Sequence, residues 1–176
     1  MDARGHRRAT PRRKGGGRRS VVYIVLGILV LLAPVILTHY KNVEQNRIAQ
    51  SYSRDVQALT PEQRDQALRT ARQYNRELPP FGAPDPWVNG IDVNSPGYKK
   101  YLEQLNVNSI MARLHAPTVG MDLPVYHGTS QSTLSHGIGH LYGTALPVGG
   151  RGTHSVLTGH TGLATLTMFD LSLIHI

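Results

Sequence analysis

The pattern of apolar and polar positions changes twice along the chain, first near residue 41 and again near residue 106. Residues 21–37 form a run of 17 residues without a charge (VVYIVLGILVLLAPVIL). Residues 38–40 extend this run to about 20 residues, which is the length that a helix needs to cross a bilayer. Residues 20–40 are therefore predicted to form a transmembrane anchor.

Basic residues are concentrated ahead of this run. Eight of the 19 Lys and Arg residues lie before residue 20, against one acid there, so residues 1–19 carry +7 of the formal net charge of +8. A basic flank is typical of the cytoplasmic side of a membrane helix. We expect a cytoplasmic tail over residues 1–19, a single-pass anchor in the cell membrane, and an extracytoplasmic domain from Lys41 onward.

Two other interpretations of the N-terminal region carry less weight. A basic arm can bind nucleic acid, but the apolar run directly after it favours the membrane, and we expect no nucleic-acid partner. A cleaved signal peptide has a shorter apolar region and a small-x-small cleavage site, and no such site follows Leu37.

Residues 41–80 have the spacing of a helical hairpin. The sequence Thr60-Pro61-Glu62-Gln63 supplies an N-cap, a proline at the first helical position and a capping-box glutamine, so a second helix is predicted to begin there. The two predicted apolar stripes consist of Ile48, Tyr52, Val56 and Leu59, and of Ala67, Ala71, Tyr74 and Leu78. We expect this hairpin to pack on the rest of the domain without a catalytic role.

Residues 81–96 are predicted to be a loop, because they are rich in proline, glycine and asparagine. This loop contains the only tryptophan, Trp87, which must either dock on the domain or stand exposed. Ser95 and Pro96 then have the pattern of a helix start. The apolar side chains of the short helix that follows are Tyr98, Tyr101, Leu102 and Leu105.

Beyond residue 106 the apolar period becomes two, as in a half-buried strand. Ile110, Ala112 and Leu114 are predicted to face the core, and Met111, Arg113 and His115 the opposite side. A second strand over residues 119–126 contains Pro124, which predicts an edge or bulged strand. Nine glycines between residues 128 and 162 indicate short strands joined by turns, so residues 97–170 are predicted to form a mainly β, closed or nearly closed body.

The chain has nine histidines and no cysteine, which raises the question of a metal site. His136 and His140 have the spacing of a helical zinc pair, but two glycines in HGIGH disfavour a helix there. His154 and His160 could also ligate a metal, yet no Asp or Glu lies between Asp122 and Asp170. We therefore expect no metal and no cofactor.

His160, in THSVLTGHTG, is predicted to stand at the end of a strand beside a glycine turn. A histidine placed in this way can pair with a thiol, favour the thiolate and then protonate a leaving group. Ser155 with Asp122 or Asp170 is a weaker alternative, since no serine has the glycine-flanked nucleophile elbow of a hydrolase. Spacing alone also permits a turn histidine without a chemical role.

The run GHLYGTALPVGGRGTHSVLTGHTGL, residues 139–163, closely resembles the sortase family, specifically class C, the pilus-assembling sortases. Residues 106–130 resemble the first two strands of that family's barrel, and Asp85-Pro86-Trp87 resembles its lid motif. The resemblance extends over about residues 20–170. It implies a sortase-like closed β-barrel, incomplete in this chain, behind a transmembrane helix and an α-helical hairpin.

The resemblance also implies an activity and its residues. His160 would be the catalytic histidine, and Asp85 and Trp87 would belong to a lid over the substrate groove. Members of this family are cysteine transpeptidases. They cleave LPXTG-like sorting signals and join pilin subunits through a lysine isopeptide bond on Gram-positive cells. Its partners here would be pilin subunits and the membrane.

The family's cysteine and arginine follow the histidine, and we expect the chain to be truncated before both and to be inactive alone. Residues 171–176 (LSLIHI) depart from the family pattern and are interpreted as a non-native read-through tail. The alternative function is a membrane-tethered extracytoplasmic β-domain that binds a partner without catalysis.

Overall fold

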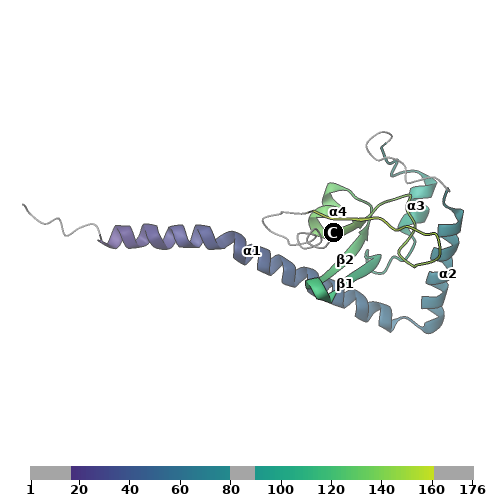
Figure 1. The fold of residues 1–176 in the computed structure, drawn as a ribbon, viewed down its shortest axis with the longest axis horizontal. Helices are drawn as coiled ribbons and strands as arrows, with labels where there is room; N and C mark the ends of the chain where they lie inside the picture. Colours follow the sequence, from purple (N-terminus) through teal and green to yellow (C-terminus); the bar gives the residue numbers. More distant parts are fainter. Residues whose placement is uncertain (1–16, 80–89, 161–176) are drawn as a thin grey trace, which may run out of the picture.

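The computed structural model describes residues 17–79 and 90–160. A long helix, α1, Gly17–Ala58, projects from a body in which a small sheet lies beside the C-terminal part of α1 and the helices α2 and α3 (Figure 1). The 42 residues of α1 run without interruption from the apolar segment into the predicted hairpin. The sequence analysis divided this region at residue 40, but the helix continues across that boundary.

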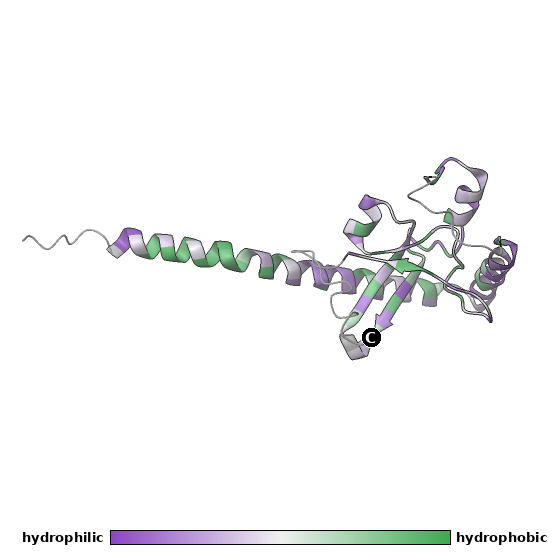
Figure 2. Ribbon diagram, turned by 45° about the horizontal axis from the view of Figure 1, so that its top comes forward, coloured by the Kyte–Doolittle hydropathy of each residue, from purple (hydrophilic) through white to green (hydrophobic). Residues whose placement is uncertain are grey.

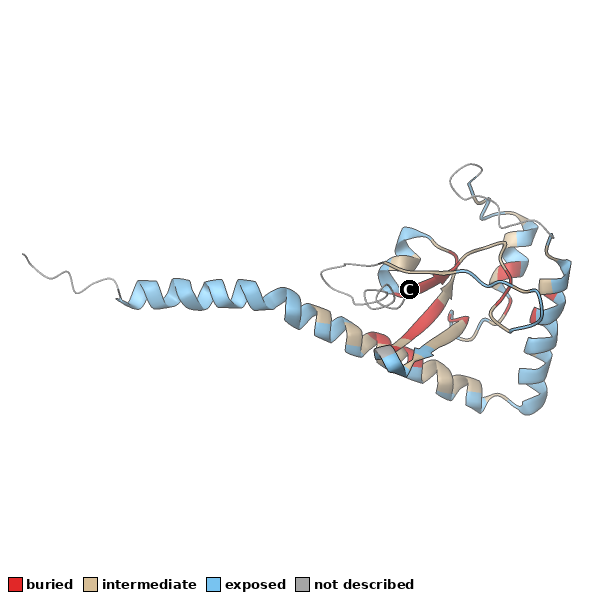
Figure 3. Cartoon of the chain, in the orientation of Figure 1, coloured by how far each residue is buried: buried red, intermediate tan, exposed pale blue. Residues whose placement is uncertain are grey.

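The two ends of α1 have different surroundings. Its apolar N-terminal part is exposed along its length (Figures 2 and 3), and this helix is long and apolar enough to cross a membrane. Its C-terminal part packs on the sheet, where Gln45 and Ala49 are buried. The Tyr52 hydroxyl donates a hydrogen bond of 2.9 Å to the carbonyl oxygen of Met111. A single helix therefore joins the apolar segment to the folded body.

The helix starts are where the sequence predicts them. In α2, Pro61–Glu77, the Gln63 amide donates to the Thr60 hydroxyl at 3.2 Å, and the Thr60 amide donates to Gln63 Oε1 at 2.9 Å. This pair of bonds confirms the predicted capping box, which satisfies two amides that the helix itself cannot. In α3, Pro96–Leu102, the Ser95 hydroxyl accepts from the Tyr98 amide, as the sequence predicts.

Four strands form the sheet, in the order β1-β2-β3-β4. β1 and β2 are antiparallel, β2 and β3 are parallel, and β3 and β4 are antiparallel. Within the described residues the sheet is open, so the closed barrel is present only in part. The strands are β1, Ala112–Ala116; β2, Met121–His127; β3, Ile138–His140; and β4, Leu157–Thr158.

The prediction that the second strand is an edge or bulged strand is wrong. β2 lies between β1 and β3, with Pro124 opposite Arg113 of β1. β3 pairs only with Val125 to His127, so no residue of β3 is opposite Pro124. A proline, which has no N–H, is tolerated inside this strand because the ladder with β3 begins one residue later.

Two short helices lie between strands where the sequence analysis expected only turns. The 3-10 helix η1, Pro117–Val119, joins β1 to β2. The α-helix α4, Gln131–His136, connects β2 to β3, and its first turn is capped by the Ser130 hydroxyl, which accepts from the Thr133 amide at 3.1 Å. The connection through α4 allows β3 to run parallel to β2.

Two apolar clusters hold these elements together. The first lies in the sheet and contains Met121, Leu123, Val125 and Ile138. The second joins α2, α3 and the segment after β3, and contains Ala71, Tyr74, Tyr101, Met111 and Leu146. Met111 was predicted to face the polar side, but it is buried, because it precedes β1 and its side chain enters the second cluster.

Candidate active site

His160 lies two residues after β4, and the end of the sheet determines its position. β4 pairs with β3, with Leu157 opposite His140 and Thr158 opposite Gly139. The segment before β4 is also fixed, since the Leu141 amide donates to the Val156 carbonyl at 2.9 Å. The backbone that leads to His160 is thus bonded to β3 and to the segment that follows β3.

The imidazole of His160 has a free ring nitrogen. The residue is half-buried, and within the described residues its Nε2 atom is buried without a hydrogen-bond partner. A buried polar atom without a partner is costly and frequently marks a functional group. A ring with one unengaged nitrogen can accept or deliver a proton to a second reactant.

The predicted lid residues Asp85 and Trp87 lie outside the described residues, as does Asp170 of the serine alternative. The other two members of that alternative, Ser155 and Asp122, do not form a catalytic arrangement. Ser155 is exposed and precedes β4. Asp122 accepts two hydrogen bonds from the Arg113 guanidinium, at 2.5 and 2.6 Å.

This ion pair gives Asp122 a structural role. The Arg113 guanidinium holds the pKa of the Asp122 carboxyl below its usual value. A third nitrogen of Arg113 donates to the Ser53 hydroxyl at 2.8 Å, so the pair also links β1 and β2 to α1. A carboxylate held in this way does not serve a catalytic triad with Ser155.

The two histidines of HGIGH do not face a common point. His136 is exposed at the end of α4, where its Nδ1 lies 2.8 Å from the Ser132 carbonyl oxygen. His140 is fully buried in β3, and both of its ring nitrogens have protein partners. No group of three or more potential metal ligands occurs in the parts of the chain that the structure describes.

The environment of His140 was missed by the sequence analysis, which considered this residue only as a metal ligand. Its Nε2 lies 2.9 Å from the Ala145 carbonyl oxygen, which can only accept, so Nε2 carries the ring proton. The single hydrogen of the Tyr101 hydroxyl has two acceptors of His140 within reach, the carbonyl oxygen at 2.9 Å and Nδ1 at 3.0 Å. The same hydroxyl accepts a hydrogen bond of 2.9 Å from the Gly128 amide.

The half-buried His127 completes this group, which we call the Tyr101 centre (Tyr101, His127 and His140). The His127 Nε2 lies 2.7 Å from the Gln104 carbonyl oxygen, and its ring meets that of Tyr101 edge-on. Burial lowers the pKa of both histidines and raises the pKa of Tyr101, so all three are neutral near pH 7. The centre fastens α3 to β2 and β3, and through β3 it supports the strand before His160.

Known proteins with a similar sequence or fold are sortases. Residues 114–172 match the Sortase domain, and this match includes His160. No curated protein sequence matches the chain. Sortase A from Corynebacterium diphtheriae is a similar solved structure, with 42% identity, a TM-score of 0.60, and coverage of 82% of this chain and 62% of that protein.

Two sortases of the C type are also similar. Sortase C-1 from Actinomyces oris has 46% identity and a TM-score of 0.58, with 66% of this chain and 64% of that protein covered. The pilus-related sortase C of Group B Streptococcus has 30% identity and a TM-score of 0.58, with 72% and 63% covered. The chain therefore has the sortase fold, and it spans between 62% and 64% of the length of these three structures.

Proposed function

We propose that this chain is the N-terminal part of a class C sortase, a membrane-anchored cysteine transpeptidase that joins pilin subunits. The Sortase domain match and the likeness to sortase C-1 of Actinomyces oris support this assignment. The likeness to a pilus-related sortase supports pilin subunits as partners. The observation that carries the proposal is the free, buried Nε2 of His160 at the end of β4.

His160 acts as the acid and base of the reaction. In the longer protein a cysteine thiolate attacks the threonine carbonyl carbon of an LPXTG-like signal, and an arginine steadies the oxyanion. The Thr–Gly C–N bond breaks as the His160 imidazolium gives its proton to the departing glycine amine. A pilin lysine amine then attacks the thioester carbonyl carbon and loses a proton to the imidazole. The C–S bond breaks, the cysteine leaves as a thiolate, and the isopeptide bond remains.

The 176 residues contain no cysteine, so they cannot form the thioester by themselves. We propose that the cysteine and the arginine belong to further residues of a longer protein, as the sequence resemblance implies. The share of the related structures that this chain spans is in line with that proposal. The 176-residue chain alone is expected to be inactive in transpeptidation.

The N-terminal part of α1 serves as the membrane anchor in this proposal. Its apolar side chains from Val21 to Leu37 are exposed and would be buried by lipid. The arginine-rich residues before it favour a cytoplasmic N-terminus, which leaves the sheet and His160 outside the cell. Asp85 and Trp87 are proposed as the lid over the substrate groove, on the basis of the Asp-Pro-Trp sequence.

A His160 substitution in the longer protein tests this function. With an LPXTG peptide and a lysine-containing pilin acceptor, His160→Ala is expected to reduce transpeptidation by roughly 10²–10⁴-fold. The matched control is His154→Ala, because His154 is an exposed histidine on the same segment. Equal activity of His160→Ala and wild type would rule out the catalytic role.

The lack of cysteine favours one other candidate, a tethered β-domain that binds a partner without catalysis. The two candidates differ in what the native gene encodes after residue 170. A downstream cysteine and arginine, in a protein that forms a thioester with an LPXTG peptide, support the sortase. A native protein without a cysteine that still retains pilin on cells supports the binding domain.

A further inference from the structure

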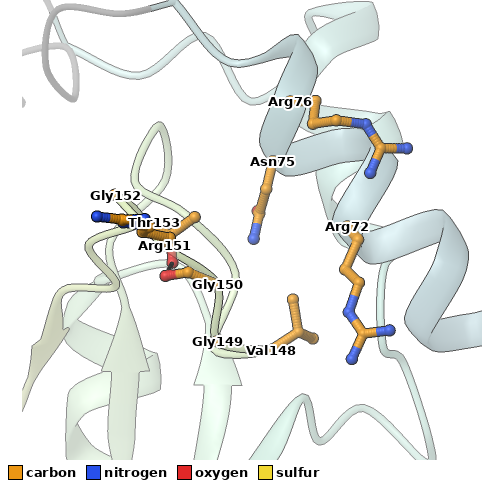
Figure 4. Close-up of a pocket in the computed structure, with 9 residues that line it drawn as sticks. All are labelled: Arg72, Asn75, Arg76, Val148, Gly149, Gly150, Arg151, Gly152 and Thr153. Atoms are coloured by element: carbon orange, nitrogen blue, oxygen red, sulfur yellow. Dashed lines mark hydrogen bonds between the residues drawn. The ribbon is translucent and has the colours of Figure 1, made fainter.

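A basic cavity that has no part in the proposed reaction lies between α2 and the loop after residue 148 (Figure 4). Its volume is about 470 Å³, within the range of small-molecule sites. Arg72, Asn75 and Arg76 of α2 line one side, and the glycine-rich loop Gly149–Gly152, with Arg151, lines the other (Figure 4). No acidic side chain is among the described residues that line it.

The two walls of this cavity, which we call the Arg–Gly pocket, are fixed relative to each other. Asn75 donates from Nδ2 to the Leu146 carbonyl oxygen at 3.1 Å, and its Oδ1 accepts from the Leu146 amide at 2.7 Å. The Thr153 hydroxyl donates to the Gly150 carbonyl oxygen at 2.9 Å and closes the loop. The pocket is therefore built by contacts between segments 71 residues apart.

The loop presents unused backbone donors. Among described residues, the amides of residues 149–152 donate to no hydrogen-bond acceptor. Gly149, Gly150 and Gly152 have φ values of +68°, +134° and +75°, and Arg151, directly before Gly152, is not among the residues of positive φ. A residue of negative φ followed by one of positive φ brings successive N–H groups to one side of the chain, an arrangement that binds anions.

The arginines add positive charge that is only partly offset, since Glu77 interacts electrostatically with Arg76. Within the described chain, Arg72, Arg76 and Arg151 form neither a hydrogen bond nor an ion pair. Glu77, the acid next to Arg76, is bonded to Lys100 at 2.6 Å. In Figure 4 the guanidinium groups of Arg72 and Arg76 point away from the loop, and that of Arg151 points away from α2, so rotation about their side-chain bonds is needed to direct them to a bound ligand.

We propose that the Arg–Gly pocket binds a phosphate group. A guanidinium fork and a row of backbone N–H groups suit a multiply charged tetrahedral oxyanion, which has enough oxygens to use both walls. A carboxylate has only two oxygens and one charge, so it would leave one wall unused. This site is independent of the proposed transpeptidase activity and does not involve His160.

Titration of the full chain in neutral-detergent micelles tests the site. The probes are inorganic phosphate and pyrophosphate, with acetate as the carboxylate comparison, all at constant ionic strength. Calorimetry is expected to show saturable binding of both phosphates that is at least about 10-fold tighter than binding of acetate. The amide signals of residues 149–152 are expected to shift with the same saturation in nuclear magnetic resonance spectra.

Two variants separate the pocket from the basic residues 1–19, which also attract anions. The double variant Arg72→Ala/Arg151→Ala removes one charge from each wall and is expected to weaken pyrophosphate binding by about 10-fold or more. The control Arg64→Ala removes an exposed arginine of α2 that does not line the pocket. Non-saturable binding, equal binding of acetate, or equal losses in the double variant and the control would overturn the proposal.

Discussion

The Tyr101 hydroxyl lies 3.0 Å from Nδ1 of His140 and joins α3 to the centre of the sheet. It also accepts from the Gly128 amide, so it bonds polar groups in β3 and at the end of β2. His140 in turn is paired with Leu157 of β4, three residues before His160. One buried hydroxyl thus supports the strand that positions the proposed catalytic histidine.

Tyr101→Phe is expected to destabilise the protein by about 1–3 kcal/mol, because it leaves buried polar groups without their partner. Urea unfolding of the chain in neutral-detergent micelles measures this change. The matched control is Tyr98→Phe, since Tyr98 lies in the same helix and no hydrogen bond of its hydroxyl occurs within the described residues. Its expected effect is within about 0.5 kcal/mol, and equal losses in both variants would contradict this account.

Stability is expected to fall as the pH drops below about 6.5, the pKa of an unperturbed histidine. Burial lowers the pKa of His127 and His140 in the folded state, so the unfolded state binds protons more readily. The contribution of these histidines to the free energy of unfolding is therefore complete above about pH 6.5. It declines as the pH falls from there toward their lower, folded-state pKa values. Unfolding free energies at pH 8, 6.5 and 5 measure the decline.

The substitutions His127→Gln and His136→Gln identify the source of that pH dependence. His127→Gln removes one of the two histidines whose pKa is lowered by burial and should reduce the decline. His136 is exposed at the end of α4, so His136→Gln should leave the decline unchanged. A pH profile that is unaffected by His127→Gln but flattened by His136→Gln would be incompatible with the Tyr101 centre as its origin.

Arg113→Lys is expected to lower stability by about 1–2 kcal/mol, because an ammonium cannot replace the two-pronged bond to Asp122 and the bond to Ser53. The comparison is Lys100→Ala, which removes an ion pair with Glu77 whose side chains are 54% and 46% exposed. Exposed pairs contribute little, so the expected loss there is smaller than for Arg113→Lys. Thermal unfolding of the two variants measures both losses. A larger loss for Lys100→Ala than for Arg113→Lys would contradict this prediction.

Asn75→Ala is expected to cost about 1–3 kcal/mol, since it leaves the Leu146 amide without its partner, while the Leu146 carbonyl keeps only the Val148 amide. It should also weaken phosphate binding, because α2 and the glycine-rich loop would no longer be held together. Gln73→Ala on the exposed side of α2 is the control for both measurements. Unaltered stability together with unaltered phosphate binding would show that the two walls are held by other contacts.

Local sequence signals explain which predictions the structure confirms. The caps at Thr60 and Ser95 depend on bonds across three residues, and the inward positions of Ala71 and Tyr101 follow from helical periodicity. The strand beginning near Ala112 follows from alternation. These features are determined within one or two turns of the chain, so residue type and spacing are sufficient to predict them.

Other features depend on partners that are distant in sequence. Pro124 lies inside a central strand because the short β3 pairs beyond it, and β3 can pair there because α4 forms the connection. The environment of His140 depends on Tyr101, 39 residues earlier. Neither relationship produces a local period or motif, which is why Pro124 predicted an edge strand and HGIGH was considered only as a metal pair.

By itself, the sequence determined the apolar segment, the helix starts, the first strand, and the resemblance that singles out His160, since each rests on neighbouring residues. The tertiary structure alone decided the open four-stranded order, the continuity of α1 into the body, the Tyr101 centre and the Arg–Gly pocket. Such features arise when burial makes distant polar groups satisfy one another, and spacing along the chain does not encode those pairings.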